Sequence, residues 1–212
     1  MKPTLICLCG KTCAGKSTLG KNLSARLGCR YISFGDLRRD EIKQHTRLGA
    51  QIQFLLDREC PIPAELGYEV IKGAIENGVL NIISGYPISI DEFRVMSRSA
   101  LVAGIIELCV DELTLIMRLG IRRECPVCHL PGVIGDVCPR HNVNMTQRDD
   151  VGIDELLKRR RLYHQRIDPF LQQEEIRQIP NLRLDSSTLA REDVASQAEM
   201  WINSTLNDGR RG

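Results

Sequence analysis

The chain has 212 residues, a length that favours one domain with a substantial core over two independent domains. Its 29 basic and 27 acidic residues leave a net charge of +2, so the overall balance does not indicate binding to nucleic acid or to an anionic membrane. No run approaches the ~18 continuous apolar residues of a membrane span, and the first apolar run is too short for a signal peptide, so we expect a cytoplasmic protein.

Apolar runs and helical periodicity alternate along the chain. Strands are predicted at residues 4–9, 79–83, 104–110 and 181–184. Helices are predicted at residues 16–27, 49–57, 64–77, 91–102, 112–119, 154–166 and 191–205. This alternation is typical of an α/β protein with a parallel sheet.

The segment between the first predicted strand and the first predicted helix matches the phosphate-loop pattern G-x-x-x-x-G-K-[ST]. Its residues are Gly10, Lys11, Thr12, Cys13, Ala14, Gly15, Lys16 and Ser17, and Thr18 follows. The glycines let backbone N–H groups surround phosphates, Lys16 neutralises charge at the transferred phosphate, and Ser17 ligates Mg²⁺. The pattern predicts an ATP-dependent phosphotransferase. The alternative is a glycine-rich turn with a chance match, and Cys13 is interpreted as a small loop residue, not a reactive thiol.

The nine cysteines are odd in number, and several lie in apolar runs, so we expect reduced thiols and no disulfide framework. Two ligand pairs, Cys125 with Cys128 and Cys138 with His141, have matching spacing and are separated by nine residues. Three thiolates and one imidazole suit a closed, structural tetrahedral Zn²⁺ site. The alternatives are unligated loop residues or a redox CxxC pair, and His129 is not expected to be a ligand.

A zinc knuckle also raises the hypothesis of nucleic-acid binding through the flanking arginines Arg122, Arg123, Arg140 and Arg148. No aromatic residues interleave with them for base stacking, so nucleotide phosphates explain these arginines more simply.

With these features in place, the chain resembles adenylate kinase and related nucleoside-monophosphate kinases across nearly its whole length. Five ordered blocks carry the resemblance: the phosphate loop, residues 32–39 (ISFGDLRR), residues 85–87 (GYP), the cysteine-bearing segment, and residues 148–150 (RDD) with Arg159. The resemblance implies one P-loop kinase domain over residues 1–212, with a five-stranded parallel sheet flanked by helices. It also implies a helical acceptor subdomain at 36–65 and a zinc-binding lid at 122–147.

The same resemblance implies a role for individual residues. Arg118 stacks on the ATP base, while Lys16, Arg122, Arg148 and Arg159 are catalytic and hold the transferring phosphate. Mg²⁺ is held by Ser17 and Asp36. The expected ATP-binding residues are Gly10, Cys13, Ala14, Gly15, Lys16, Ser17, Thr18 and Arg118. The expected acceptor-binding residues are Phe34, Arg39, Ile62, Gly85, Tyr86 and Glu92.

The chain departs from the family at the acceptor side. The family pattern Asp-Gly-Phe-Pro-Arg is replaced by residues 84–88, SGYPI, so an aspartate and an acceptor-binding arginine are missing at Ser84 and Ile88. Phe34 replaces a threonine, and Glu92 replaces a glutamine. We therefore predict a nucleoside-monophosphate acceptor but not a standard adenylate kinase. The alternatives are a kinase of a non-nucleotide metabolite, or a catalytically silent protein that senses nucleotides or binds nucleic acid.

Overall fold

The computed structural model describes residues 2–147 and 165–208. The strands are β1 (Thr4–Gly10), β2 (Arg30–Ser33), β3 (Leu80–Ser84), β4 (Leu101–Cys109), β5 (Arg122–Glu124), β6 (Pro131–Val133) and β7 (Asn181–Asp185). The helices are α1 (Lys16–Leu27), α2 (Phe34–Lys43), α3 (Arg47–Asp57), α4 (Ala64–Lys72), α5 (Ile90–Ser97), α6 (Glu112–Ile121), α8 (Glu174–Arg177) and α9 (Arg191–Asp208). Residues 165–171 are helical as well.

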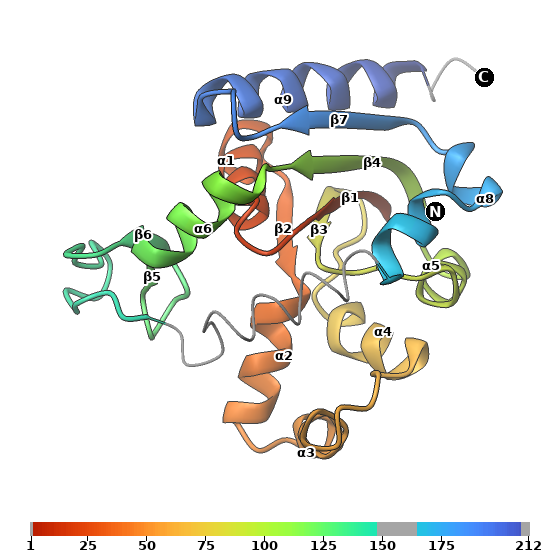
Figure 1. The fold of residues 1–212 in the computed structure, drawn as a ribbon. Coiled ribbons are helices and arrows are strands. Elements are labelled where there is room, and N and C mark those ends of the chain that lie inside the picture. Colours follow the sequence, from red (N-terminus) through yellow and green to blue (C-terminus); the bar gives the residue numbers. More distant parts are fainter. Residues whose placement is uncertain (1, 148–164, 209–212) are drawn as a thin grey trace.

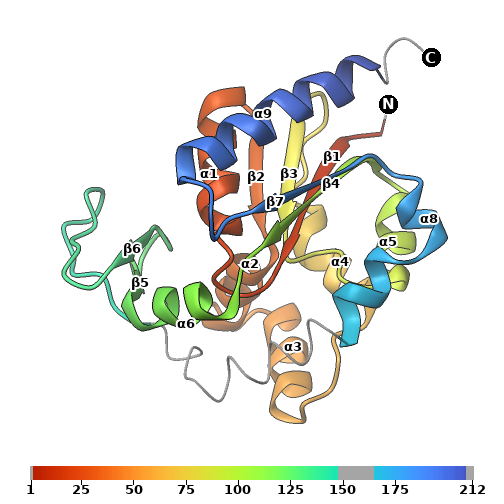
Figure 2. The ribbon, with the colours of Figure 1, turned by 45° about the horizontal axis from the view of Figure 1, so that its top comes forward.

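Five strands form one parallel sheet in the order β2-β3-β1-β4-β7, with helices on both faces (Figure 1). The predicted α/β class and five-stranded parallel sheet are confirmed. Figure 2 shows α1 and α9 side by side on one face of the sheet, with α4 and α5 on the other. Among the described residues, no helix has the length and apolar character needed to cross a membrane.

Strand β1 lies at the centre of the sheet, and its side chains divide between two cores. Ile6 and Leu8 pack with α1 and α9, whereas Leu5, Cys7 and Cys9 pack on the opposite face. Successive side chains of a strand point to opposite faces, and helices cover both faces of this sheet. Each residue from Leu5 to Cys9 is therefore apolar.

Most predicted elements lie within a few residues of the observed ones, but some predictions were wrong. The helix predicted at 91–102 ends at Ser97, because Leu101 already pairs with Thr4 as part of β4. The helix predicted at 64–77 ends at Lys72, and the chain then turns where the Glu76 N–H donates to the side chain of Asn81. Of the helix predicted at 154–166, residues 154–164 lie outside the described residues.

Strand β2 and helix α2 were missed. Strand β2 is an edge strand with one buried residue, Ile32, and α2 buries none of its residues completely, so neither has a long apolar signal. Helix α2 packs against α3, and residues 122–146 fold around the separate β5–β6 hairpin with a small core of Cys125, Cys138 and Met145. The boundaries 36–65 and 122–147 stay predictions.

Candidate active site and metal centre

The phosphate loop joins the carboxyl end of β1 to the start of α1. Gly10 has a φ of 144°, and a Cβ at this position would lie 2.6 Å from the Leu108 carbonyl oxygen, so only glycine fits beside β4. Gly15, with a φ of 100°, is the N-cap of α1 and supplies no capping side chain. The first N–H groups of α1 therefore point from the helix end toward the loop, as in a phosphate-binding turn.

A cavity of about 560 Å³ opens beside this loop. Residues 13–18, Arg118 and Arg122 line it, and so do Phe34, Asp36, Arg39 and Gly85. The hairpin residues Pro131, Gly132 and Val133 also line it, so the predicted lid segment and the loop share one cavity. Of the other predicted ligand-binding residues in the described ranges, Gly10, Ile62, Tyr86 and Glu92 do not line it.

Within the part of the chain that the structure describes, Lys16 and Arg122 bring cationic groups to the phosphate loop. The Lys16 Nζ donates to the carbonyl oxygens of Gly10 and Lys11, at 2.6 and 2.7 Å. Arg122, at the boundary between α6 and β5, places Nη1 3.5 Å from the Cys13 sulfur. Positive charge is therefore gathered around the loop, where phosphates need it.

Ser186, which is not among the residues predicted from the sequence, connects the phosphate loop to β4 and α6. Its buried hydroxyl lies 3.0 Å from the carbonyl oxygens of both Ala14 and Cys109. Arg118 Nη1 in turn donates to this hydroxyl across 3.1 Å. Its position just after the last predicted apolar strand was the signal, because ligands bind at the carboxyl ends of parallel strands.

The acceptor side of the cavity combines an ion pair with apolar walls. Arg39 forms an ion pair with Asp36 on the same helix, and Ser33 caps that helix by accepting from the Asp36 N–H. The rings of Phe34 and Tyr86 lie 5.6 Å apart, centre to centre, and Phe34 forms the cavity wall. Ile88 lines the cavity as well. It gives the cavity an apolar wall at the position where the family pattern has a charged arginine.

Glu92 is buried, and its carboxylate serves the loop before α5. The carboxylate accepts a hydrogen bond from the Ile88 N–H at 2.7 Å. Burial raises the pKa of Glu92, while that hydrogen bond and the positive charge of Arg166 act in the opposite direction. The structure thus gives Glu92 a local partner in the chain and does not bring it to the cavity wall.

Tyr31, which was also not predicted as a site residue, lies under α1, the helix that follows the phosphate loop. Its hydroxyl is 2.7 Å from the hydroxyl of Ser84, the residue that replaces the family's aspartate. Burial raises the pKa of Tyr31, and hydrogen bonds to Ser17 and Ser84 partly oppose this. Hydroxyl groups therefore occupy the floor of the site between the phosphate loop and the acceptor side.

The four predicted metal ligands come together in the segment that follows β5. The donor atoms of Cys125, Cys128, Cys138 and His141 all lie within 4.8 Å of one another. Nearest pairs are 3.6 to 3.8 Å apart. Bonds of ~2.3 Å to sulfur and ~2.0 Å to nitrogen at tetrahedral angles give separations of this size, so the donor set fits zinc.

The Cys125 thiol is prepared for metal binding. Desolvation opposes its ionisation, but the backbone N–H groups of Cys128 and Val127 stabilise the thiolate and lower the pKa of Cys125 to about 6. A thiolate is the form that ligates a metal.

Two predicted catalytic residues, Arg148 and Arg159, lie outside the described residues. The remaining predicted groups define a P-loop kinase: a phosphate loop at the carboxyl end of a central parallel strand, cationic side chains around it, and a lid segment that lines the same cavity.

Comparison with known proteins agrees with this class. No family model matches the chain. The chain is 31% identical over 186 residues to an adenylate kinase of Pseudothermotoga lettingae, a match covering 79% of this chain and 84% of that protein. Adenylate kinases of Thermotoga petrophila and Finegoldia magna are 30% and 28% identical, over 74% and 77% of this chain and 79% and 83% of those proteins. The chain belongs to the adenylate kinase family and is a nucleoside-monophosphate-kinase-like phosphotransferase.

Proposed function

We propose that the protein transfers the γ-phosphate of Mg·ATP to a nucleoside monophosphate. The acceptor is either a monophosphate other than AMP or any of a range of monophosphates that includes more than AMP. The observation that carries the proposal is a single cavity lined both by the phosphate loop and by Asp36, Arg38 and Arg39. A donor phosphate at the loop and an acceptor phosphate at these arginines would share one cavity, which in-line transfer needs.

The chain's own groups have distinct proposed tasks. Lys16 and Arg122 neutralise the oxygens of the transferring phosphoryl group, and the N–H groups at the start of α1 orient the ATP phosphates. Arg118, braced by Ser186, holds the adenine end. Arg148 and Arg159 remain predicted members of the clamp. Covering of the loop by the lid excludes water that would otherwise accept the phosphate.

Two bound metals are part of the proposal. Ser17 and Asp36 are the residues that would hold Mg²⁺, and the bound ion would supply positive charge to offset that of the phosphates. Zinc is proposed at Cys125, Cys128, Cys138 and His141, where a full set of protein ligands makes it structural. The expected cytoplasmic location stays a prediction.

The acceptor base is proposed to lie against Phe34 and Ile88. Neither side chain has a hydrogen-bonding group, and the carboxylate of Glu92 is engaged by the Ile88 N–H. Hydrogen bonds from these positions would then contribute little to base selection, and Arg39, with Arg38 beside it, would hold the acceptor phosphate. We therefore expect AMP to be favoured over CMP and UMP by less than about tenfold in kcat/KM.

The test is a substrate panel of AMP, GMP, CMP, UMP and their deoxy forms with Mg·ATP. The Lys16→Ala variant should reduce turnover by about 10²- to 10³-fold, while Lys72→Ala, a change of an exposed lysine on α4, leaves it unchanged. A strong preference for AMP alone would contradict the proposed specificity.

The apolar Ile88 in the acceptor wall favours a second candidate, a metabolite acceptor without a nucleotide phosphate. This candidate gains support if ATP binds and every nucleoside monophosphate fails. ATP binding without phosphotransfer to any acceptor would instead support a catalytically silent protein that senses nucleotides. Nucleic-acid binding without phosphotransfer would support a zinc knuckle that binds nucleic acid.

A further inference from the structure

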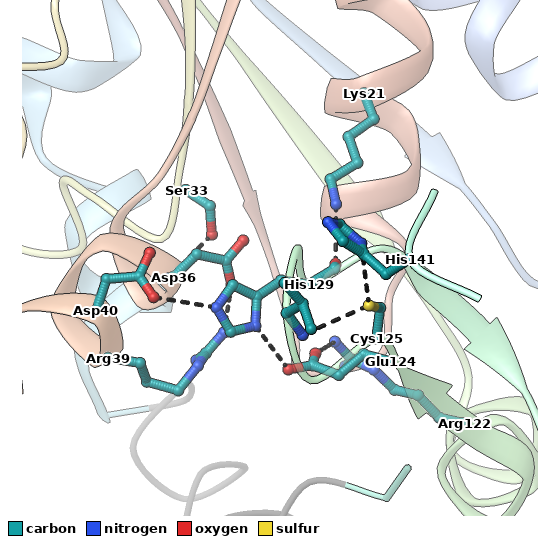
Figure 3. Close-up of polar contacts among 11 residues, drawn as sticks. Lys21, Ser33, Asp36, Arg39, Asp40, Arg122, Glu124, Cys125, His129 and His141 are labelled. Atoms are coloured by element: carbon teal, nitrogen blue, oxygen red, sulfur yellow. Dashed lines mark hydrogen bonds and ion pairs between the residues drawn. The ribbon is translucent and has the colours of Figure 1, made fainter. Parts of the chain in front are cut away.

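His129 joins two segments that are distant in the sequence. Its Nε2 lies 3.2 Å from a carboxylate oxygen of Asp40 on α2, 89 residues away, and its Nδ1 lies 3.2 Å from a carboxylate oxygen of Glu124 on β5. Figure 3 shows the ring between the two carboxylates, one on each side. A ring nitrogen that carries a proton donates to the carboxylate facing it. The contact therefore connects the lid to the acceptor side.

The turn between the first two metal ligands fixes the position of this histidine. The His129 N–H donates to the Cys125 carbonyl oxygen at 3.0 Å, and the Cys125 N–H donates to the Leu130 carbonyl oxygen at 2.9 Å. His129 adopts the left-handed region with a φ of 54°, which directs the chain out of the turn. The ring is thus carried by the same rigid turn that holds Cys125 and Cys128.

A third part of the protein meets the same residue. The Lys21 ammonium group, on the helix that follows the phosphate loop, donates to the His129 carbonyl oxygen at 2.8 Å. Its pKa is lowered by desolvation, against the opposing effect of Asp36. The phosphate-loop helix, the lid and α2 therefore converge on one residue (Figure 3).

We infer that His129 is a positioning residue that clamps the lid to α2, so that ordering either segment orders the other. Asp40 follows Arg39, which lines the cavity, and Glu124 precedes the hairpin residues that also line it. Only 17% of the His129 side chain is exposed, whereas 41% of the Asp40 side chain is, so the contact between them is partly shielded from water. The coupling holds whatever the acceptor is; its use in catalysis rests on the proposed function.

Amide hydrogen exchange of the zinc-loaded, full-length protein tests the clamp from both sides. Asp40→Ala changes only α2, yet it should speed exchange of lid amides near Cys125–His129 by about fivefold, the lower end of typical couplings between sites. His129→Ala should speed exchange of amides in α2 similarly. Lys43→Ala, an exposed change on the same helix, is the matched control and should leave the lid unaffected.

Further measurements separate the clamp from a general structural effect. Zinc content must stay equal in every variant. The double variant His129→Ala/Asp40→Ala should speed exchange in the lid no more than His129→Ala alone, because both substitutions remove the same contact between His129 and Asp40. Unchanged lid exchange in Asp40→Ala, or an equal change in Lys43→Ala, would overturn the inference.

An ATP arm distinguishes the clamp from the proposed function. Saturating Mg·ATP should slow exchange of α2 amides in the wild type and slow it less in His129→Ala. If the wild type fails to bind ATP, the proposed function fails, while the exchange comparison in free protein still decides the clamp. ATP protection of α2 that is equal in both proteins would count against the clamp.

Discussion

The hydroxyl of Ser186 lies 3.0 Å from the carbonyl oxygen of Ala14 and so ties the chain after β7 to the phosphate loop. Arg118 donates to the same hydroxyl, so one small side chain positions both the loop and a residue proposed to contact ATP. Ser186 is buried, and its partners would have no substitute from water.

Removing this hydroxyl should affect ATP binding more than it affects the fold. In Ser186→Ala we expect a loss of about 1 kcal/mol of stability, because a buried hydrogen-bonding group is left without its partner. We expect the Kd for ATP to rise about fivefold, measured by calorimetric titration. The control is Ser204→Ala, an exposed change on α9 that should alter neither quantity. An unchanged Kd in Ser186→Ala would show that Ser186 does not position the loop.

Two glycines on helices should respond in opposite directions to alanine. At Gly49 an added Cβ would meet the Glu41 carbonyl oxygen at 2.1 Å, so Gly49→Ala should separate α2 from α3 and cost about 1–3 kcal/mol. At Gly120, on α6, nothing lies within 4 Å of such an atom, and Gly120→Ala should stabilise the protein by about 0.5–1 kcal/mol. Urea unfolding measures both, and equal effects of the two changes would contradict the close packing of α2 on α3.

The N-cap of α6 predicts a pH dependence of stability. The Thr114 N–H and hydroxyl donate to the Asp111 carboxylate and lower the pKa of Asp111 from 3.8 to about 2. A lowered pKa in the folded state means that the carboxylate stabilises the fold above the ordinary pKa, and that this contribution is lost as the pH falls toward 2. The Tm difference between wild type and Asp111→Ala should therefore be full at neutral pH and shrink through this acidic range.

Asp111→Asn provides the control for that titration, because its side-chain oxygen still caps the helix but has no charge to lose. The Tm difference between Asp111→Asn and Asp111→Ala should not vary over the same pH range. If wild type and Asp111→Ala differ equally at all pH values, the carboxylate does not contribute through its ionised form.

Metal removal should disorder the lid and leave the main sheet intact. The small core of the lid consists of Cys125, Cys138 and Met145, so the ligands themselves form most of it. Elemental analysis should find one zinc per chain, and Cys138→Ser should fall well below that, whereas Cys60→Ser, a change of an exposed cysteine, should not. Chelation should expose residues near Cys125–His141 to protease and reduce turnover with little change in the main unfolding transition. Full zinc content in Cys138→Ser would contradict the four-ligand site.

The class of fold and two parts of the site could be predicted from the sequence because their signals are local. A buried parallel strand is a continuous apolar run, and the loop after β1 needs glycine, lysine and serine at fixed spacing. The metal site was also predicted from local spacing, because the two ligand pairs that begin at Cys125 and Cys138 have the same spacing. The strand β2 and the helix α2 have no such run, and the start of β4 was hidden because Leu101 and Val102 continued the helical pattern before them.

Tertiary structure alone decided which polar side chains meet. Ser186 reaches Ala14 because β7 and β1 are both parallel to β4, so their carboxyl ends lie at one edge of the sheet. His129, expected only to stand outside the metal site, reaches Asp40 because the turn after Cys125 lies against α2. Glu92, expected to contact the acceptor, is instead engaged by Ile88. Spacing along the chain determines local geometry, whereas contacts between distant segments depend on how the packed elements place them.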